Sequence, residues 1–524
     1  MTACPRHMGS MSQWNRSPVD GWLSLPEPKG HPVVERTRFL FADQLGPHFD
    51  HGGQLLFVES KAVFRRHRYH RQKAHLILSA LWHRAEAEPD RVHLVRSETY
   101  RTGLAEVDTT AMEAIAATSR PARVLQRELG FAEIHPELGW FTSADEFGEW
   151  VRSRGSKRLL MEDWYRGVRR GHDVLMEDDA PAGGQWNFDA QNRLPPPRGE
   201  THLPVPEPWQ PTEDDIDARV RAELDSWEAE GIEFLGKDGP RRFAVTRAEA
   251  LSALDDFLGN RLAMFGPYED AVLWRDPFMA HSLLSVPLNL GLLHPAEVVD
   301  RAVAAWHADA ATLASVEGLV RQIIGWREYV WHLYWHLGAE YEQRNALQAH
   351  TTPPDWFLEA KWEEVDAHCL KRSLQNVDEL GYAHHIIRLM VLSNWATQRG
   401  YSPQAVNDWF RRAFVDGYPW VMTANVIGMG LYADGGLMAT KPYISGGAYL
   451  KKMTDFCGEC RYDPKVRVGE KACPFTAGYW AFLDDHRDDF TGNHRMGTAL
   501  RTLDKLTDLP DLLEQEKARG TGAP

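Results

Sequence analysis

The sequence predicts a two-part protein, in which an N-terminal α/β unit with a parallel, Rossmann-like sheet precedes a large all-α unit. Its 524 residues exceed one ordinary domain, so more than one core is expected. Within residues 36–160 short apolar runs alternate with a helical pattern, whereas from residue 246 to 524 apolar residues recur at helical spacings. Residues 161–245 include a stretch rich in proline and glycine, which predicts a long, irregular connection.

The sheet of the α/β unit is predicted from three short apolar runs that have the character of buried strands. These runs are residues 38–41, 54–58 and 92–95. Residues 74–87, between the second and third runs, carry apolar side chains at helical spacing. This alternation predicts a parallel sheet that binds ligands at the carboxyl ends of its strands. Asp43 and Gln44 follow the first run and Glu59 the second, so they are candidate ligand contacts or ordinary loop residues.

The composition is that of a folded globular protein, with 43% hydrophobic and 25% charged residues. Residues 1–35 lack an apolar signal core, and the chain has no run of about 18 apolar residues. We therefore expect a polar N-terminal tail, no membrane span and a cytoplasmic location. The net charge of −15 argues against a protein coated with nucleic acid, but it permits a local basic patch.

Four cysteines in the last third of the chain form the strongest chemical pattern. Cys457 and Cys460 make a CxxC, Cys473 follows and Cys369 precedes them, while Cys4 lies in the tail. Four thiolates in a cytosolic chain suit a tetrahedral zinc site or an iron–sulfur cluster, and the spacing leaves both open.

Two further groups of polar residues in the helical unit are candidates for chemistry. Residues 281–285 offer hydroxyl groups and backbone N–H groups that suit a phosphate at a helix N-terminus, or a simple cap. His384 and His385 are adjacent and titrate near neutrality, which suits general-acid work, although a buried structural histidine is the commoner case. Arg388 and Asp416 could pair across two helices.

In its order of motifs the helical unit resembles the FAD domain of photolyases and cryptochromes. The shared positions are residues 281–285, 326–328, 385–388 and Asp416. The four cysteines narrow the resemblance to the iron–sulfur bacterial cryptochromes and photolyases, the prokaryotic (6-4) photolyases. Further matching segments are residues 184–193, 321–329, 425–429, 433–436, 440–443 and 460–464. The resemblance covers roughly residues 36 to 500.

This resemblance implies the photolyase/cryptochrome fold and a set of cofactors. It implies a [4Fe–4S] cluster on Cys369, Cys457, Cys460 and Cys473. It implies a 6,7-dimethyl-8-ribityllumazine antenna at the α/β unit, near Asp43, Gln44 and Glu59, and a divalent cation such as Mg²⁺ near Asp189. It also implies FAD, with contacts from His281, Ser282, Leu284, Ser285, Gln322, Arg327, Arg388, Asp416, Met422 and Asn425.

The activity that the resemblance implies is light-driven repair of the pyrimidine (6-4) pyrimidone lesion by a monomeric enzyme. Excited reduced FAD would donate an electron to a flipped dinucleotide, because the lesion is out of reach inside the duplex. His385 is then expected to donate a proton, with His384 as its support, and Trp409 to carry electrons to the flavin. Lesion contacts are expected from Asp189, Tyr443 and Tyr449.

DNA phosphates require cations, and two basic stretches could supply them. Residues 436–471 hold seven Lys or Arg against four Asp or Glu, and Lys441, Lys451 and Arg461 are the foremost candidates. Residues 61–73 hold six Lys or Arg and no acid. This second stretch is either a DNA contact or a solvated helix face.

The chain departs from the family pattern at three places. Phe410 stands where relatives carry a tyrosine, so the electron path beyond Trp409 is expected to use Trp356 or Trp362. Met422 stands where several branches hold a polar residue near flavin N5. The segment between residues 107 and 131 is shorter than in the family, which predicts a missing or replaced strand or helix and weakens the antenna expectation.

Two rival functions remain at the level of sequence. One is a bacterial cryptochrome of the same fold, a blue-light photoreceptor with little repair activity. The other is a colourless, flavin-free zinc protein that binds nucleic acid. The histidine pair and the pair Tyr443 and Tyr449 favour repair, because signalling needs no proton donor above a lesion.

Overall fold

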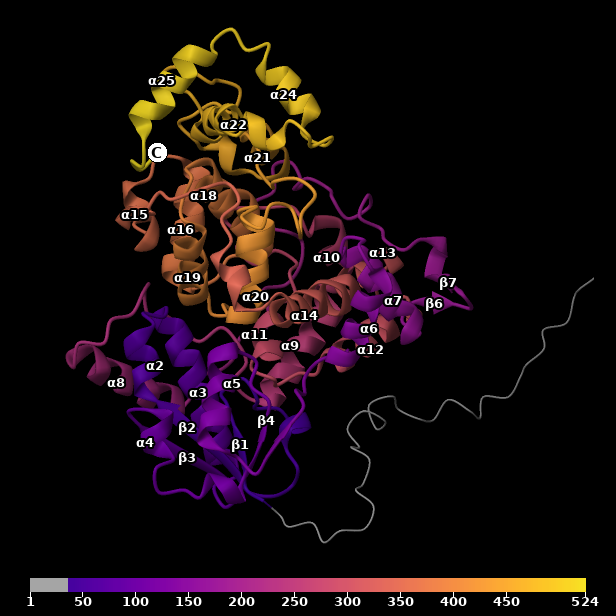
Figure 1. The fold of residues 1–524 in the computed structure, drawn as a ribbon, viewed down its shortest axis with the longest axis vertical. Coiled ribbons are helices and arrows are strands. Elements are labelled where there is room, and N and C mark those ends of the chain that lie inside the picture. The colour runs from indigo at the N-terminus through magenta and orange to yellow at the C-terminus, as the bar shows by residue number, and fades with distance from the viewer. Residues whose placement is uncertain (1–35) are drawn as a thin grey trace, which may run out of the picture.

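A parallel five-stranded sheet forms the N-terminal part of the computed structural model, which describes residues 36–524 (Figure 1). The tail predicted for residues 1–35 lies outside the described residues. The strands run in the order β3-β2-β1-β4-β5 and all pair in parallel. Their bounds are β1 Arg38–Leu40, β2 Leu55–Ser60, β3 Val92–Ser97, β4 Glu113–Ile115 and β5 Glu133–His135. The three predicted strands are thus confirmed, together with the predicted helix, α3 (Arg71–Ala87).

The expectation that a strand or helix is missing between residues 107 and 131 is wrong. This segment contains β4 and the ten-residue helix α5 (Arg120–Leu129), and β5 follows directly. Helix α5 is compact because Ser119 caps its N-terminus and Gly130 ends it in the left-handed conformation. A short connection therefore still holds a complete strand–helix–strand unit.

The rest of the chain is almost entirely helical. Its helices are α9 Arg247–Asn260, α10 Leu262–Tyr268, α11 Ser285–Asn289, α12 Pro295–His307, α13 Leu313–Val320, α14 Glu328–Leu337, α15 Asp355–Leu358, α16 His368–Leu380, α17 His385–Ile387, α18 Asn394–Gln398, α19 Pro403–Ala413, α20 Pro419–Thr423, α21 Gly447–Met453, α22 Pro474–Asp485, α23 Arg487–Phe490, α24 Gly497–Leu503 and α25 Leu509–Arg519. Three π-helical segments interrupt them: η4 Arg321–Arg327, η7 Arg388–Ser393 and η8 Ala424–Gly430. No helix among the described residues is long and apolar enough to cross a membrane.

The connection between the two units is not irregular throughout, contrary to expectation. It contains α7 (Met161–Gly171) and α8 (Asp215–Ala229). The preceding helix α6 (Ala144–Arg154) was expected to belong to the sheet unit, but it packs on the helical unit, where the Phe147 and His332 rings stack 4.8 Å apart. Helix α6 therefore contacts the helical unit although it lies within the predicted range of the sheet unit.

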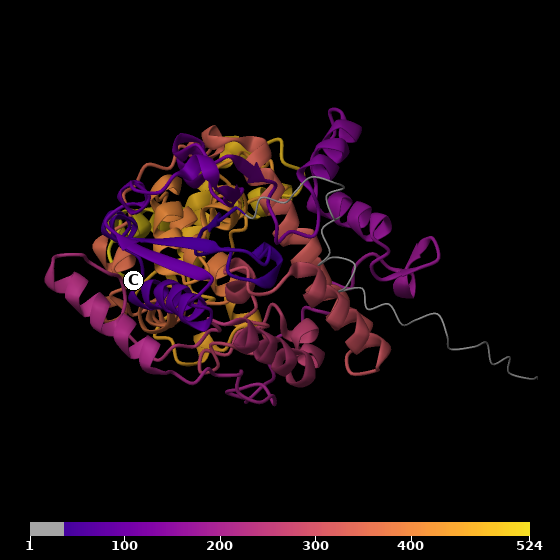
Figure 2. The same cartoon turned by 90° about the horizontal axis from the view of Figure 1, so that it is seen from below.

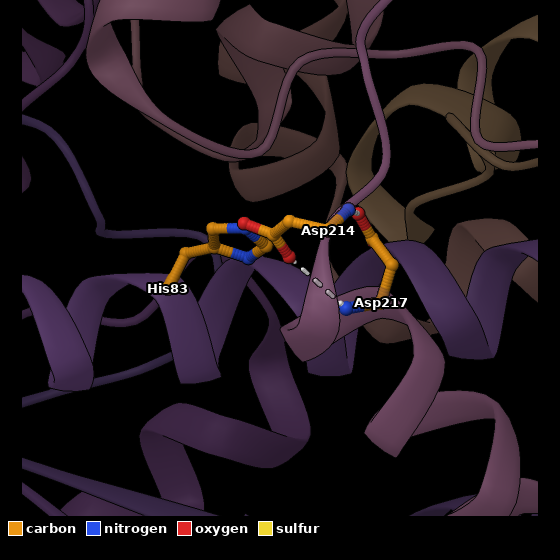
Figure 3. A group of neighbouring side chains, drawn as sticks. All are labelled: His83, Asp214 and Asp217. Atoms are coloured by element: carbon orange, nitrogen blue, oxygen red, sulfur yellow. Dashed lines mark hydrogen bonds and ion pairs between the residues drawn. The ribbon is translucent and has the colours of Figure 1, made fainter.

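Helix α8 is fixed on α3 by a polar cluster (Figure 3). Nε2 of His83 lies 3.1 Å from the Asp214 carboxylate, which also caps the N-terminus of α8. The Asp217 carboxylate accepts hydrogen bonds from Ser79 Oγ at 2.6 Å and from Arg241 Nε at 2.9 Å. Because both carboxylates are already bonded to protein donors, this cluster is explained as a helix attachment.

The sheet and the helical unit share one hydrophobic core. Leu40, Leu55 and Phe57 point to the α3 side of the sheet, and their cluster continues into α14 and α12. Phe39 and Leu56 point to the opposite side, as the two-residue period of a strand requires. In Figure 2 the strands are seen lying across the helices of the C-terminal half. The two units therefore hold each other in a fixed orientation.

Candidate active site

An ion pair between Arg388 and Asp416 forms the centre of the candidate site. Arg388 begins η7, and Asp416 lies in the turn between α19 and α20. Arg388 Nη1 donates to Asp416 Oδ1 at 2.8 Å, and Ser285 Oγ donates to Asp416 Oδ2 at 2.8 Å. The Arg388 guanidinium also lies 4.0 Å from the centre of the Phe414 ring. The pairing predicted from sequence is therefore present, and it links three separate segments.

The three π-helical segments coincide with three of the segments that carried the resemblance. Gln322 lies in η4, Arg388 in η7 and Asn425 in η8. A π-helical turn widens a helix by one residue and frequently marks a functional site. Apolar spacing does not reveal such a turn, so this feature was not predicted from the sequence.

Three histidines lie together near this ion pair. The His281 and His384 rings stack with centroids 4.4 Å apart, and His385 follows on an exposed edge. Nε2 of His281 and both ring nitrogens of His384 have no hydrogen-bond partner among the described residues, although these atoms are buried. Buried polar atoms are normally bonded, so unpaired ones indicate a place that a ligand completes.

Burial favours the neutral form of these imidazoles. It is the main cause that lowers the pKa of His281 to about 3 and places the pKa of His384 well below its ordinary value. His385 is exposed at the surface, yet the protein that surrounds its ring partly desolvates it. This desolvation and the Arg388 cation lower the pKa of His385 to about 4. A histidine of this cluster therefore takes up a proton near pH 7 only when a negative charge close by stabilises its charged form.

The predicted phosphate role of residues 281–285 has a modest basis in the structure. Helix α11, which begins at Ser285, has only five residues, and Leu283 before it has a positive φ of 58°. Ser282 Oγ accepts a hydrogen bond from the Leu284 N–H, which is an ordinary local turn. His281 stacks in the histidine cluster instead.

The other expected flavin contacts lie in different surroundings. Leu284 and Met422 are buried, Gln322 is exposed, and Asn425 Nδ2 donates to the Val421 carbonyl. Arg327 stacks on Trp140 at 4.0 Å and donates to Glu328, so its contacts lie with the segment that follows β5. Residue spacing alone could not distinguish Arg327 from the contacts that gather around Asp416.

The expected lesion contacts form one group at the surface. Asp189 pairs with Arg321 at 2.6 Å and with Arg193 at 2.9 Å. Tyr443 is 38% exposed, and burial with the Asp270 carboxylate raises the pKa of Tyr449 to about 12. Among the described residues, Asp189 belongs to no group of three or more potential ligand atoms within 4.8 Å of one another. The predicted divalent cation therefore receives no geometric support.

Trp409 lies in a buried aromatic chain behind the ion pair. Its ring centroid is 6.0 Å from that of Phe414 and 4.8 Å from that of Phe357, which is 5.8 Å from Trp356. Trp362 makes no ring contact with these aromatics among the described residues. Of the two expected electron donors beyond Trp409, the structure connects Trp356.

The three antenna candidates differ in how their side chains are used. Gln44 is buried and bonded at both ends, to the Phe41 N–H and the Ala116 carbonyl. Glu59 is buried and accepts from Trp82 and Arg96. Asp43 lies at the switch point of the strand order, accepts from Thr118 and from its own backbone N–H, and has a pKa raised by burial. The Asp43 side chain is therefore bonded to one other residue, whereas Gln44 and Glu59 are each bonded to two.

The four predicted cysteine ligands converge on one cavity. Cys369 from α16 meets Cys457, Cys460 and Cys473, and all four are free thiols. The cavity is partly open to solvent and is otherwise lined by Tyr462, Gly447 and apolar residues. Burial and the neighbouring sulfurs raise the pKa of the Cys369 thiol. Four thiols that converge on one largely apolar cavity suit a metal centre.

The spacing of these sulfurs bears on the choice between zinc and an iron–sulfur cluster. Around one tetrahedral zinc, with Zn–S of about 2.3 Å, all sulfurs lie about 3.8 Å apart. Among residues 36–524, the cysteines form no group of three within 4.8 Å of one another. The sulfurs are spread more widely than a single zinc ion requires, as they are when each thiolate binds a different iron.

Comparisons with known proteins agree with this geometry. Residues 38–233 match the family model described as deoxyribodipyrimidine photo-lyase-related protein. A protein of Agrobacterium fabrum named (6-4) photolyase is 36% identical over 467 residues, which are 84% of this chain and 88% of the relative. The chain belongs to the (6-4) photolyase family. A crystal structure of a bacterial class III photolyase from Agrobacterium tumefaciens matches the fold of this photolyase with a TM-score of 0.54 at 16% identity, over 91% of this chain and 100% of that one.

The basic residues of this photolyase are used in two different ways. Most of the stretch 61–73 is bonded within the protein: Lys61 pairs with Glu230, Arg71 pairs with Asp225, and Lys73 is buried. Arg66 is exposed and forms no ion pair with a described residue, so a DNA contact of this stretch would depend on Arg66. Of the C-terminal candidates, Arg461 pairs with Asp366, whereas Lys441 and Lys451 form no ion pair with any described residue.

An open groove, which sequence reasoning missed, lies beside Lys441. Arg158, His494 and Arg495 line it together with the carboxylates Asp434 and Asp489, and the rest of the lining comes from Tyr432, residues 435–437, Thr440 and residues 492–493. Neither Arg158 nor Arg495 pairs with a carboxylate of residues 36–524, although most arginines of this acidic chain do. Arg158 and Arg495 are more than 300 positions apart in sequence, so no local pattern could have joined them.

Proposed function

We propose that this enzyme repairs pyrimidine (6-4) pyrimidone lesions in DNA by light-driven electron transfer from reduced FAD. Family membership supports this proposal, and the observation that carries it is the histidine cluster beside the Arg388–Asp416 pair. Unpaired ring nitrogens of His281 and His384 lie behind His385 on an exposed edge of this pair. A repair enzyme needs a proton donor there, and a light sensor does not.

The residues of the helical unit fit FAD. Arg388, Asp416 and Ser285 offer a fixed set of donors and acceptors, and the unpaired histidine nitrogens offer further partners. Gln322 and Asn425 would join them from the other two π-helical segments. When bound and reduced, FAD would supply the electron on absorbing light. The role of the chain is to bind the flavin, hold Asp416 in place and keep Met422 as an apolar wall.

His385 would hold the proton that the repair reaction transfers between the two bases. Its pKa of about 4 keeps the imidazole neutral near pH 7 in the free protein. The negative charges of an incoming DNA strand raise that pKa, so substrate binding itself would load the proton. His384 supports this ring from the buried side, stacked on His281.

The four cysteines would bind a [4Fe–4S] cluster rather than zinc. The wide spacing of the sulfurs supports the cluster, and the apolar cavity accepts it. Cys369 comes from α16, whereas the other ligands lie near α21 and α22. A cluster bound there ties distant segments together, so we assign it a structural role.

DNA would lie across the exposed edge formed by Tyr443, Lys441 and the groove with Arg158 and Arg495. These cations form no ion pair with a described carboxylate. Arg158 donates to the Gly436 carbonyl and Arg495 to Thr440 Oγ1, and their remaining N–H groups would meet phosphates. Tyr443 supplies an exposed ring beside them for an unstacked base. Lys451 is exposed as well and would extend this surface. A ribityllumazine antenna would bind at Asp43, which follows β1 at the switch point of the strand order.

The test compares His385→Ala with the exposed control His350→Ala. Each purified protein is photoreduced and incubated with a (6-4) oligonucleotide under blue light, and both the flavin spectrum and the products are measured. We expect His385→Ala to bind and photoreduce FAD normally but to lose at least 100-fold in repair, the lower range for general-acid catalysis. Unchanged repair by His385→Ala would remove the proton-donor role.

A further inference from the structure

Lys73 is a buried cation from the sheet unit that lies directly behind the Asp416 turn. It belongs to the first turn of α3 and is 3% exposed. Its Nζ donates to the carbonyl oxygen of Arg411 at 2.7 Å and to that of Gly417 at 2.6 Å. The Tyr69 and Tyr418 rings lie 4.7 and 5.4 Å away. No carboxylate of residues 36–524 pairs with it, which is unusual for a buried lysine.

The two carbonyls that Lys73 binds lie on either side of Asp416. Arg411 is in the last turn of α19, where carbonyl groups have no partner within the helix, and Gly417 follows Asp416 directly. A cation at a helix C-terminus is stabilising. A Cβ at Gly417 would lie 2.6 Å from the Phe410 carbonyl oxygen, so this turn is tight and permits only glycine. Lys73 therefore fixes the turn that holds Asp416 against Arg388.

Charges around Lys73 are arranged for an anion. Asp416 attracts it, while Arg388 and Arg411 repel it. Arg411 pairs with Glu342 at 2.9 Å, but Glu342 also pairs with Arg120 at 3.1 Å, so this carboxylate is shared between two arginines. Lys73 and Arg388 both face the carboxylate of Asp416, and burial and the two arginines lower the pKa of Lys73 to about 7. Positive charge therefore exceeds negative charge beside the ion pair, and a negatively charged ligand would favour the charged form of Lys73.

We propose that Lys73 is a positioning residue of the flavin site, through which the sheet unit fixes Asp416 and favours the reduced, anionic flavin. This inference rests on the proposed FAD site. Lys73 touches neither substrate nor flavin in this account, since it acts through the Asp416 turn. The sheet unit then does more than carry an antenna, because it completes the electrostatics of the catalytic unit.

Gln72 provides a matched control from the same segment. Gln72 is buried like Lys73, and it also joins the sheet unit to the rest of the chain. Its Nε2 donates to the carbonyl of Lys237, in the connection, and to the carbonyl of Glu379, at the end of α16. Gln72→Leu therefore weakens the contact between the units without touching the Asp416 turn. Lys73→Met removes the charge and both hydrogen bonds, and Lys73→Gln removes the charge but keeps a donor.

The experiment measures FAD release, by the rise of free-flavin fluorescence on dilution, and the midpoint potential of the bound flavin. We expect Lys73→Met to release FAD at least tenfold faster than the wild type. The midpoint potential of its bound flavin should be more negative, by about 30 mV for each tenfold loss in the preference for reduced over oxidised flavin. Lys73→Gln should shift the potential in the same direction, and it replaces Lys73→Met if that variant does not fold. Gln72→Leu should release FAD at a rate within twofold of the wild-type rate.

Two results would overturn the proposal. One is a folded Lys73 variant with wild-type release and potential, and the other is a Gln72→Leu protein that shares the full effect, which would reduce Lys73 to a contact between units. Wild-type protein that carries no flavin would instead refute the proposed function.

Discussion

Adding one methyl group at Gly447 tests the cysteine cavity without removing a ligand. Gly447 begins α21 and lines the cavity. A Cβ there would lie 2.9 Å from Cys473 Sγ and 2.8 Å from both Pro464 Cβ and Thr476 Oγ1. Ordinary carbon contacts begin near 3.5 Å, so each distance is too short by about 0.6 Å or more. Gly447→Ala must therefore move the cysteine or the walls of its cavity.

Moving the neighbours of Gly447 aside costs free energy. Thr476 Oγ1 accepts from the Gly447 N–H at 2.9 Å and donates to the Pro464 carbonyl at 2.9 Å, so moving it weakens two hydrogen bonds. Overpacking costs about 1–3 kcal/mol, and a weakened hydrogen bond adds about 1 kcal/mol. We take about 2 kcal/mol as the local cost, which corresponds to roughly thirtyfold faster loss of the cluster.

Gly458 provides the control, because it lies inside the CxxC and a Cβ there meets nothing within 4 Å. The assay follows the visible absorbance and the iron content of each purified protein in the presence of an iron chelator. Gly447→Ala should lose the cluster roughly thirtyfold faster than wild type, and Gly458→Ala at the wild-type rate. Equal rates in all three proteins would refute the cavity as the site of the cluster.

Three other predictions follow from the same structure. Cys369→Ala should lose its iron and its visible absorbance, whereas Cys4→Ala should keep both; iron retained by Cys369→Ala would contradict the four-ligand assignment. Burial and Asp270 raise the pKa of Glu269 from 4.5 to about 8, so the folded chain holds this proton more tightly and stability falls as the pH rises between those values. Glu269→Gln should therefore narrow the difference in unfolding temperature between pH 5.5 and 8, and an unchanged difference would count against the buried neutral carboxyl. Arg158→Ala with Arg495→Ala should weaken binding of duplex DNA and lower its salt dependence by about two charges, while FAD binding stays normal; an unchanged salt slope would exclude the groove as a DNA contact.

Features set by local pattern were predictable from the sequence. Strands β1, β2 and β3 and helix α3 were found because their apolar periods lie within one short window. The four cysteines were predicted because a CxxC followed by a third cysteine is typical of a metal centre in a chain with few cysteines. Strand β4 was missed because it has only three residues and no apolar pattern. One of the three, Glu113, is charged and pairs with Arg38 of the neighbouring strand β1.

Features set by distant contacts were not predictable in this way. Lys73 read as part of a basic stretch, because the carbonyls that enclose it lie 338 and 344 positions further along the chain. The stacking of His281 on His384 was not predicted, because the two residues belong to segments about one hundred positions apart. The choice between zinc and a cluster also depended on distances between sulfurs, which spacing in sequence does not contain.

The central claim is light-driven repair, and product analysis tests it most directly. The reduced protein is incubated with a (6-4) thymine-dimer oligonucleotide under blue light and in the dark, and the strands are separated and weighed. The account predicts restoration of the two thymines in the light sample alone. Protein that holds both FAD and the cluster yet restores no thymines under light would contradict it, and would direct attention to a light sensor of the same fold.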